Sequence, residues 1–289
     1  MRRVLSIVLF STVCLTSLRS QDIVRIREFA DQQYLKGNLS SALKEYQRVL
    51  FFDAGNKFEQ VYSDIADLYF RQENYQQALV YYDFARKAVP DDSLRLEYSF
   101  KRIECYFRQD NYLMALSELY GLPGKLSPYF EVKKDLYYAI CHFGLNETEE
   151  SVEYFSRIVD STGADRIDSL MKAYQKVRTK YDPDRLEIMS IFLPGLGQLV
   201  AGDVKNGLNS LFLLGGIAAY SFHTMRIYGI LDGTLVLVTW FYRYYTGGHK
   251  KAHELGVTRI REQQRMTYRK IMETVASHRV DGPSAQGSL

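Results

Sequence analysis

The chain has few of the residues that interrupt or cross-link secondary structure. Only six prolines and three cysteines occur in 289 residues, and no segment has the pattern of a convincing β-strand. Proline breaks the interior of helices and of sheets, so a chain poor in proline accommodates long helices. Large aromatic residues are abundant, with 23 Tyr and 16 Phe. This composition is typical of helices that pack through large side chains, and we predict an all-α protein.

An excess of charge of either sign is also lacking. The chain carries 37 basic and 34 acidic side chains, for a net charge of +3. Such a balance gives no basic surface that would favour nucleic acid, and we expect no nucleic-acid partner. The hydrophobic fraction of 46% is enough for a sizeable core and argues against wholesale disorder.

No set of residues has the spacing of a catalytic or metal-binding site. The glycines of 195–207 lie in apolar sequence and follow no strand, unlike a phosphate-binding loop. Asp232 lies near the end of an apolar run, where structural placement is favoured over a proton relay. The histidines form no ligand spacing with acids or cysteines on one helix face; they are His142, His223, His249, His253 and His278. We therefore predict no catalytic residue, no metal site, no cofactor and no enzymatic activity.

The first twenty residues are typical of an export signal. Arg2 and Arg3 precede an apolar segment from Val4 to Leu15, which is short for a membrane span. We predict a signal peptide over residues 1–20, cleaved in our first interpretation and retained as an anchor in the second.

The middle of the chain repeats itself. Four segments align on a small residue, and these residues are spaced 36, 37 and 36 positions apart: Ala42, Ala78, Ala115 and Ser151. A large residue follows each small one by four positions, as Tyr46, Tyr82, Leu119 and Phe155. A period of this length, with two helices in each unit, predicts a solenoid of stacked helix pairs.

These residues resemble the tetratricopeptide repeat over about residues 23–160. The second unit matches best, with Tyr62, Ile65, Ala66, Tyr69, the Glu73-Asn74-Tyr75 turn, Ala78, Tyr82, Ala85 and Pro90. The resemblance implies paired antiparallel helices whose alanines allow close approach. An amphipathic run around Ile167, Met171 and Tyr174 then predicts a capping helix, which extends the repeat domain over residues 21–181.

The register of the repeats places one aromatic of each first helix on the inner face. These aromatics are Tyr34, Phe70, Phe107 and Phe143. Acids stand one turn earlier and arginines one residue later, as Asp31, Asp67, Glu104, Arg71 and Arg108. One interpretation is a groove that binds an extended or helical peptide, and the other is that the aromatics only pack. We expect the domain as a whole to bind a protein or peptide partner.

Cys105 and Cys141 occupy the same position of adjacent repeats. Stacked helices lie about 8–10 Å apart between their axes, which is long for a disulfide. We expect both to be buried free thiols.

Two apolar stretches follow the repeats, Leu208 to Met225 and Tyr228 to Tyr245. Each is close to the ~20 residues that span a bilayer, and the short connection permits only an antiparallel hairpin. The alternative is a buried helix pair of a soluble domain, but Leu211 to Ala219 shows no polar face. The sequence therefore predicts a transmembrane helical hairpin. A third crossing by residues 188–201 would place the following basic residues on the cytoplasmic side, but that segment is short for a span.

Glycines and a glutamine precede the hairpin in a characteristic spacing. They are Pro194, Gly195, Gly197, Gln198, Gly202 and Gly207. This P-G-x-G-Q run resembles a motif of small bacterial membrane-hairpin proteins, over about residues 186–250. The resemblance implies a membrane module at 186–248 whose short re-entrant or interfacial segment packs on the hairpin, with Gln198 bonding free backbone groups.

Residues 249–289 comprise a basic amphipathic helix over 250–278 and a tail that looks disordered. The helix either adheres to anionic lipid headgroups or is a solvated helix. Together these features predict a membrane-anchored interaction scaffold in the bacterial inner membrane, with its repeats on the periplasmic side. The alternative is a subunit of a transport or envelope-assembly complex that contacts other membrane subunits through the hairpin.

Overall fold

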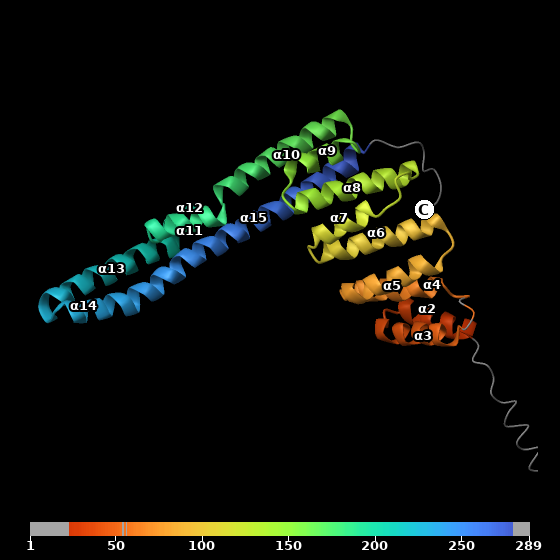
Figure 1. The fold of residues 1–289 in the computed structure, drawn as a ribbon, viewed down its shortest axis with the longest axis horizontal. Helices are drawn as coiled ribbons and strands as arrows, with labels where there is room; N and C mark the ends of the chain where they lie inside the picture. The colour runs from red at the N-terminus through yellow and green to blue at the C-terminus, as the bar shows by residue number, and fades with distance from the viewer. Residues whose placement is uncertain (1–22, 54, 56, 280–289) are drawn as a thin grey trace, which may run out of the picture. The chain divides into compact units, whose positions relative to one another are not determined.

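In the computed structural model, residues 23–53, 55 and 57–279 are described, and every regular element among them is a helix (Figure 1). The prediction of an all-α fold is confirmed. The predicted signal peptide and the tail beyond residue 279 lie outside the described residues. The chain divides into two compact units, Met1–Asn146 and Glu147–Leu289.

Unit 1 consists of sequential helices in antiparallel pairs, an arrangement consistent with a repeat array. Its helices are α2 (Ile23–Leu35), α3 (Leu39–Phe52), α4 (Gln60–Arg71), α5 (Tyr75–Ala88), α6 (Asp92–Arg108), α7 (Tyr112–Tyr120) and α8 (Pro128–Gly144). The pairs are α2 with α3, α4 with α5, and α6 with α7, and each pair packs on the next through consecutive helices. Helix α8 packs on α7.

The turn after each first helix has one residue in the left-handed conformation. The four residues and their φ angles are Gly37 (78°), Glu73 (59°), Asp110 (53°) and Asn146 (64°). Their spacing repeats the 36–37 residue period of the sequence. Non-glycine residues rarely adopt this conformation, although Asn and Asp tolerate it best. Asn146 therefore extends the turn to the fourth repeat, although that segment has neither the glycine nor the acid–Asn pair of the others.

The small residues of the repeats lie where helices approach each other. Ala42, Ala78 and Ala115 are fully buried, and Tyr46 and Tyr82 fill the space beside the first two. Both cysteines are buried and unbridged, as expected, and burial raises the pKa of Cys105 and of Cys141 to about 12. Thiols with such a pKa pack as apolar side chains and do not act as nucleophiles.

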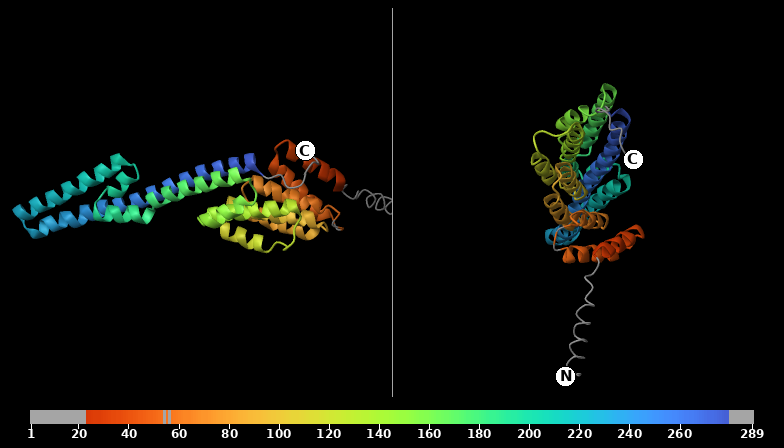
Figure 2. Two further views of the ribbon diagram at one scale, coloured as in Figure 1. Left: turned by 90° about the horizontal axis from the view of Figure 1, so that it is seen from above. Right: turned by 90° about the vertical axis from the view of Figure 1, so that its right-hand side faces the viewer.

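Unit 2 is organised around one long helix. Its elements are α9 (Thr148–Ser156), α10 (Ser161–Lys180), α11 (Pro183–Phe192), α12 (Leu196–Val200), α13 (Val204–Tyr228), α14 (Ile230–Val236), the π-helical η1 (Leu237–Phe241) and α15 (Tyr242–His278). Helix α15 returns along α11 and α10, while α13 pairs with α14 and η1 (Figure 2). The helix expected to cap the repeats, α10, packs on α9 and α15. The basic helix expected over 250–278 is the greater part of α15, and its buried face packs on α10 and α11.

The predicted hairpin is present, but its arms differ from membrane spans. No helix in the described part of the chain combines the length and the apolar character that a bilayer crossing needs. The prediction of two spanning helices is therefore corrected. Helix α13 includes Asn209, His223 and Arg226, which lower its hydropathy. The returning arm carries Asp232 and is divided into α14, η1 and the start of α15.

Candidate functional site

The acids predicted to flank the groove are bonded inside unit 1. Each accepts a hydrogen bond from a tyrosine hydroxyl: Tyr46 to Asp31 (2.6 Å), Tyr82 to Asp67, and Tyr137 to Glu104 (2.5 Å). The pKa values of Tyr46 and Tyr82 are raised above the ordinary value for tyrosine. Burial is the largest cause, and the hydrogen bond to the acid is the next. The first two pairs each span 15 residues and occupy equivalent positions in adjacent repeats. Asp31 and Asp67 therefore tie together the two helices of one repeat, whereas Glu104 ties α6 to α8.

The predicted groove arginines stack on the aromatic one repeat earlier. The guanidinium carbon of Arg71 lies 4.7 Å from the centre of the Tyr34 ring, and that of Arg108 lies 5.8 Å from the centre of the Phe70 ring. Such cation–π contacts contribute about 0.5–1 kcal/mol at exposed positions. The arginines therefore connect neighbouring repeats.

Arg71 and Arg108 are nevertheless exposed. Neither forms an ion pair with an acid of the described residues. A guanidinium with one face on an aromatic ring keeps its N–H edge free for a carboxylate of another molecule. Two such groups on successive repeats form a surface suited to an acidic segment.

The aromatics of the predicted ladder are buried to different degrees. Tyr34, Phe70 and Phe107 are half-buried, whereas Phe143 is only 3% exposed. Phe70 packs edge-on against Tyr75, with ring centres 5.4 Å apart. The first three aromatics thus offer some ring surface, and Phe143 is part of the core.

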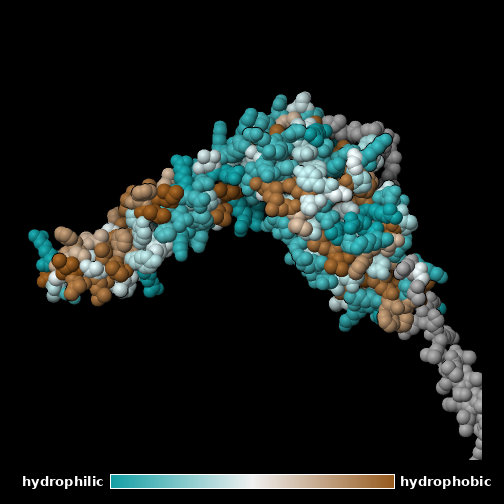
Figure 3. Space-filling view, in the orientation of Figure 1, coloured by the Kyte–Doolittle hydropathy of each residue, from teal (hydrophilic) through white to brown (hydrophobic). Residues whose placement is uncertain are grey.

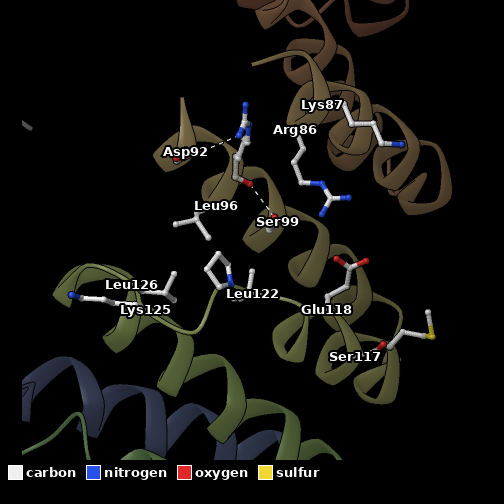
Figure 4. Close-up of a pocket in the computed structure, with 14 residues that line it drawn as sticks. Arg86, Lys87, Asp92, Leu96, Ser99, Ser117, Glu118, Leu122, Lys125 and Leu126 are labelled. Atoms are coloured by element: carbon white, nitrogen blue, oxygen red, sulfur yellow. Dashed lines mark hydrogen bonds and ion pairs between the residues drawn. The ribbon is translucent and has the colours of Figure 1, made fainter. Parts of the chain in front are cut away.

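A separate cavity of about 890 Å³ lies between α5, α6, α7 and the loop that leads to α8 (Figure 4). Leu96 of α6 and Leu122 and Leu126 of the loop form an apolar wall. Arg86, Lys87, Arg95 and Lys125 form a basic rim, although the first three already pair with acids. The sequence signal for this cavity is the Gly121-Leu-Pro-Gly-Lys125 loop, whose breakers separate α7 from α8.

The glycine motif of unit 2 forms a tight junction of helices. A Cβ atom on Gly195 would lie 2.1 Å from the carbonyl oxygen of Gly207, and one on Gly197 would lie 2.0 Å from that of Leu186. Gly195 and Gly202 adopt left-handed φ angles of 90° and 87°. Pro194 lies in the turn between α11 and α12. The motif therefore allows backbones to approach where a side chain would not fit.

Gln198 is almost completely buried in this junction. Its side-chain nitrogen donates to the backbone oxygen of Gly248 in α15, at 3.0 Å. This bond joins α12 to α15.

Beyond the junction, the hairpin of α13, α14 and η1 exposes large apolar side chains on both arms (Figure 3). Leu231 at the turn is 86% exposed. The others include Phe212, Phe222, Ile227, Ile230, Leu235, Val238 and Trp240. Soluble surfaces rarely gather so many apolar side chains, so the hairpin is a candidate docking surface.

One group of metal-ligating side chains comes together among the described residues, Asp184, Glu187 and His253. The spacing of these residues in the sequence does not predict the group, because the two acids and the histidine lie on different helices, far apart in the chain.

Comparison with known proteins adds no identification: no family model matches the chain, and no curated protein matches it.

Proposed function

We propose that the chain is a membrane-attached interaction scaffold. In this proposal its helix pairs act as tetratricopeptide-like repeats that bind an acidic segment of a protein partner, and its hairpin attaches the molecule to a lipid bilayer. The observation that carries the proposal is the exposure of many large apolar side chains on both arms of the hairpin, between Phe212 and Trp240.

Lipid is the occupant that this surface fits best. Apolar side chains project from both helices of a two-helix hairpin, so one flat protein partner would leave much of the surface in water. Trp240, Tyr242 and Tyr244 are exposed where the apolar arm joins the polar part of α15. Aromatic residues of this kind are enriched at the boundary between lipid headgroups and hydrocarbon. The hairpin embeds in the interface by its apolar surface, as interfacial helices do.

The partner of the repeats is inferred from the charge of the inner face. Arg71 and Arg108 present guanidinium edges beside half-buried rings, whereas Asp67 and Glu104 are engaged by tyrosine hydroxyls. The surface therefore favours a peptide that carries acids spaced with apolar residues. The signal-like N-terminus adds the expectation that this unit lies on the periplasmic side of a bacterial inner membrane.

Flotation with liposomes tests the attachment. We expect the full chain to float with vesicles of phosphatidylcholine and phosphatidylglycerol, and the double variant Phe212→Asp, Leu231→Asp to remain at the bottom of the gradient. The matched control is Leu35→Asp, Phe51→Asp, which alters two single apolar residues of unit 1 that are 83% and 81% exposed. Equal flotation of the hairpin variant and the control would refute lipid attachment by the hairpin.

A second function is favoured by one specific observation on α13. Gly215 and Gly216 face open space, where an added Cβ atom would meet nothing within 4 Å, and Ala219 is exposed. Small residues on one helix face allow another helix to approach closely in a membrane. In this alternative the hairpin packs on other subunits of a transport or envelope-assembly complex. A Gly215→Leu, Gly216→Leu variant that loses co-purifying membrane proteins but still floats would favour this role.

A further inference from the structure

Two helices of unit 2 bring acids and imidazoles into one cluster. Asp184 and Glu187 are one turn apart on α11, and His249 and His253 are one turn apart on the antiparallel α15. The ligand atoms of Asp184, Glu187 and His253 all lie within 4.8 Å of one another. Sixty-two residues separate Glu187 from His249, so the cluster exists only through the packing of α11 on α15.

The spacing of these atoms matches that around a single metal ion. Nδ1 of His253 lies 3.2 Å from Oε2 of Glu187 and 3.6 Å from Oδ1 of Asp184. Zinc bonds nitrogen and carboxylate oxygen at about 2.0–2.2 Å, so two of its ligand atoms in tetrahedral geometry lie about 3.3–3.6 Å apart. His253 therefore lies at the separation of a neighbouring ligand from each of the two carboxylates, and the two carboxylates lie within 4.8 Å of one another.

The geometry of the cluster leaves one nitrogen without a hydrogen bond. Nδ1 of His253 is enclosed and forms no hydrogen bond with any described residue, although two carboxylates face it. An enclosed polar atom without a partner is destabilising. A cation between His253 and the two carboxylates would satisfy all three groups, because imidazole then acts as a neutral donor of its lone pair.

His249 supports the same carboxylate from its other side. Its Nδ1 lies 2.8 Å from Oε1 of Glu187, so with the proton on Nδ1 it donates a hydrogen bond there. This bond directs Oε2 of Glu187 toward His253. Outer hydrogen bonds of this kind orient metal ligands and raise affinity.

The packing of the two helices holds the cluster in place. A Cβ atom on Gly256 of α15 would lie 2.8 Å from the carbonyl oxygen of Tyr181 and 3.2 Å from the side chain of Leu186. This close contact lies one turn from His253 and just before Asp184. The ligands thus project from two helices whose separation is fixed by backbone contact.

We propose that Asp184, Glu187 and His253 bind a divalent transition-metal ion, with His249 positioning Glu187. Mixed imidazole and carboxylate ligands suit zinc, and also manganese, iron or cobalt. The site has three protein ligands, so a fourth position is open to water. By linking α11 to α15, the ion stabilises the base of the hairpin.

Metal titration of the full chain in mild detergent tests the site. We expect about one equivalent of Zn²⁺ by calorimetry. Co²⁺ should give a visible absorption band that Zn²⁺ abolishes. The variant Glu187→Gln keeps the size of the side chain and removes its charge, and it should weaken Zn²⁺ binding at least about tenfold. The double variant Glu187→Gln, His253→Ala should abolish binding.

The matched control is Glu262→Gln, His223→Ala, which alters an exposed acid of α15 and an exposed histidine of α13. It should bind Zn²⁺ as the unchanged chain does, and circular dichroism compares the helix content of all variants. Absence of Zn²⁺ and Co²⁺ binding to the unchanged chain would overturn the proposal and leave a salt bridge between carboxylates and protonated histidines. Equal affinity in Glu187→Gln and in the control would also overturn it, because the ion would then bind elsewhere.

Discussion

At the scale of single residues, side chains that look like binding groups in the sequence often hold the fold together. Asp67 was predicted to face a partner, yet it accepts the hydroxyl of Tyr82 and lies 3.4 Å from Lys101. In the preceding repeat, Asp31 accepts a hydrogen bond from the hydroxyl of Tyr46 in the same way. The regular spacing of these acids reflects a repeated internal hydrogen bond, and the arginines next to the aromatics are the groups that remain open to a partner.

One carboxylate links helix geometry to acid stability. Asp160 begins α10, where it accepts the backbone N–H of Gly163 at 2.7 Å and faces His278 at 3.2 Å. The backbone hydrogen bond, followed by His278, lowers the pKa of this carboxyl below its ordinary value of 3.8. The unfolded chain therefore binds more protons than the folded chain just below pH 3.8, and stability falls as the pH falls through that range.

We expect the substitution Asp160→Asn, which keeps a side-chain oxygen to cap the helix, to reduce the decrease in stability at acid pH. Urea midpoints measured at several values between about pH 3 and pH 5 check the slope. Asp165→Asn, an exposed carboxyl on the same helix, is the control and should keep the slope of the unchanged chain. A slope for Asp160→Asn equal to that of the control would contradict the stated role of Asp160.

At the scale of helices and turns, the sequence predicted what depends on near neighbours. The period of the small residues anticipated the helix pairs, because each alanine sits where its own pair packs. The left-handed turns follow the same period, since Gly37, Glu73 and Asp110 end equivalent helices. The contacts of α15 were not predictable, because no feature of residues 242–278 indicates that α11 packs against this helix. For the same reason the histidines of α15 did not appear as metal ligands.

The hairpin shows a different limit of sequence reasoning. An apolar segment of suitable length predicted a span, but the polar residues Asn209 and His223 lie within that segment and lower its mean hydropathy. The π-helical turn at Leu237–Phe241 also divides the returning arm, which no sequence period indicates. The helical nature and antiparallel pairing of the two arms were nevertheless predictable from the short connection.

Two glycines of unit 2 should respond oppositely to the same substitution. We expect Gly197→Ala to destabilise the protein, because its Cβ atom would overlap the carbonyl oxygen of Leu186 at 2.0 Å and force α11 and α12 apart. We expect Gly215→Ala to stabilise it by about 0.8–1 kcal/mol, because alanine favours helix and this position is open. Thermal unfolding of both variants gives the comparison. Shifts of the same sign would contradict the close packing of the junction.

The charge of the inner face provides a test of recognition in unit 1. Peptides selected from a display library on the unchanged chain should be rich in Asp and Glu. Arg71→Glu, Arg108→Glu should lower their affinity at least about tenfold, because each substitution places a like charge against the ligand. The loss of two cation–π contacts should cost about 1–2 kcal/mol of stability, measured by urea unfolding.

A control with the same change of charge distinguishes the inner face from the nearby cavity. Lys87→Glu, Lys125→Glu alters two basic residues at the rim of the cavity in Figure 4. It should leave peptide affinity within about twofold, since exposed charges at a distance are largely screened by salt. Loss of binding in this variant but not in the arginine variant would move the peptide site to the cavity.

At the scale of the whole molecule, the proposed function assigns recognition and attachment to different units. The repeats of unit 1 carry the open arginines, and the exposed apolar surface belongs to the hairpin of unit 2. The junction of α11, α12 and α15 lies between the hairpin and the rest of unit 2, and the proposed metal ligands lie beside it. Removal of the hairpin alone should therefore leave folding and peptide binding intact.

A chain that lacks the hairpin can be designed from the contacts between its two arms. A Cβ atom on Gly248 would lie 3.8 Å from Oγ of Ser210, so α13 and α15 are adjacent at this level. Replacing residues 213–245 by a short Gly-Ser turn keeps this contact and the bond from Gln198 to Gly248. We expect the shortened chain to keep its helix content for the remaining residues, bind the selected peptides unchanged and fail to float with liposomes. Because the hairpin holds the exposed apolar side chains, flotation of the shortened chain would place lipid attachment elsewhere in the protein. If the shortened chain loses both peptide binding and flotation, recognition and attachment are not separable.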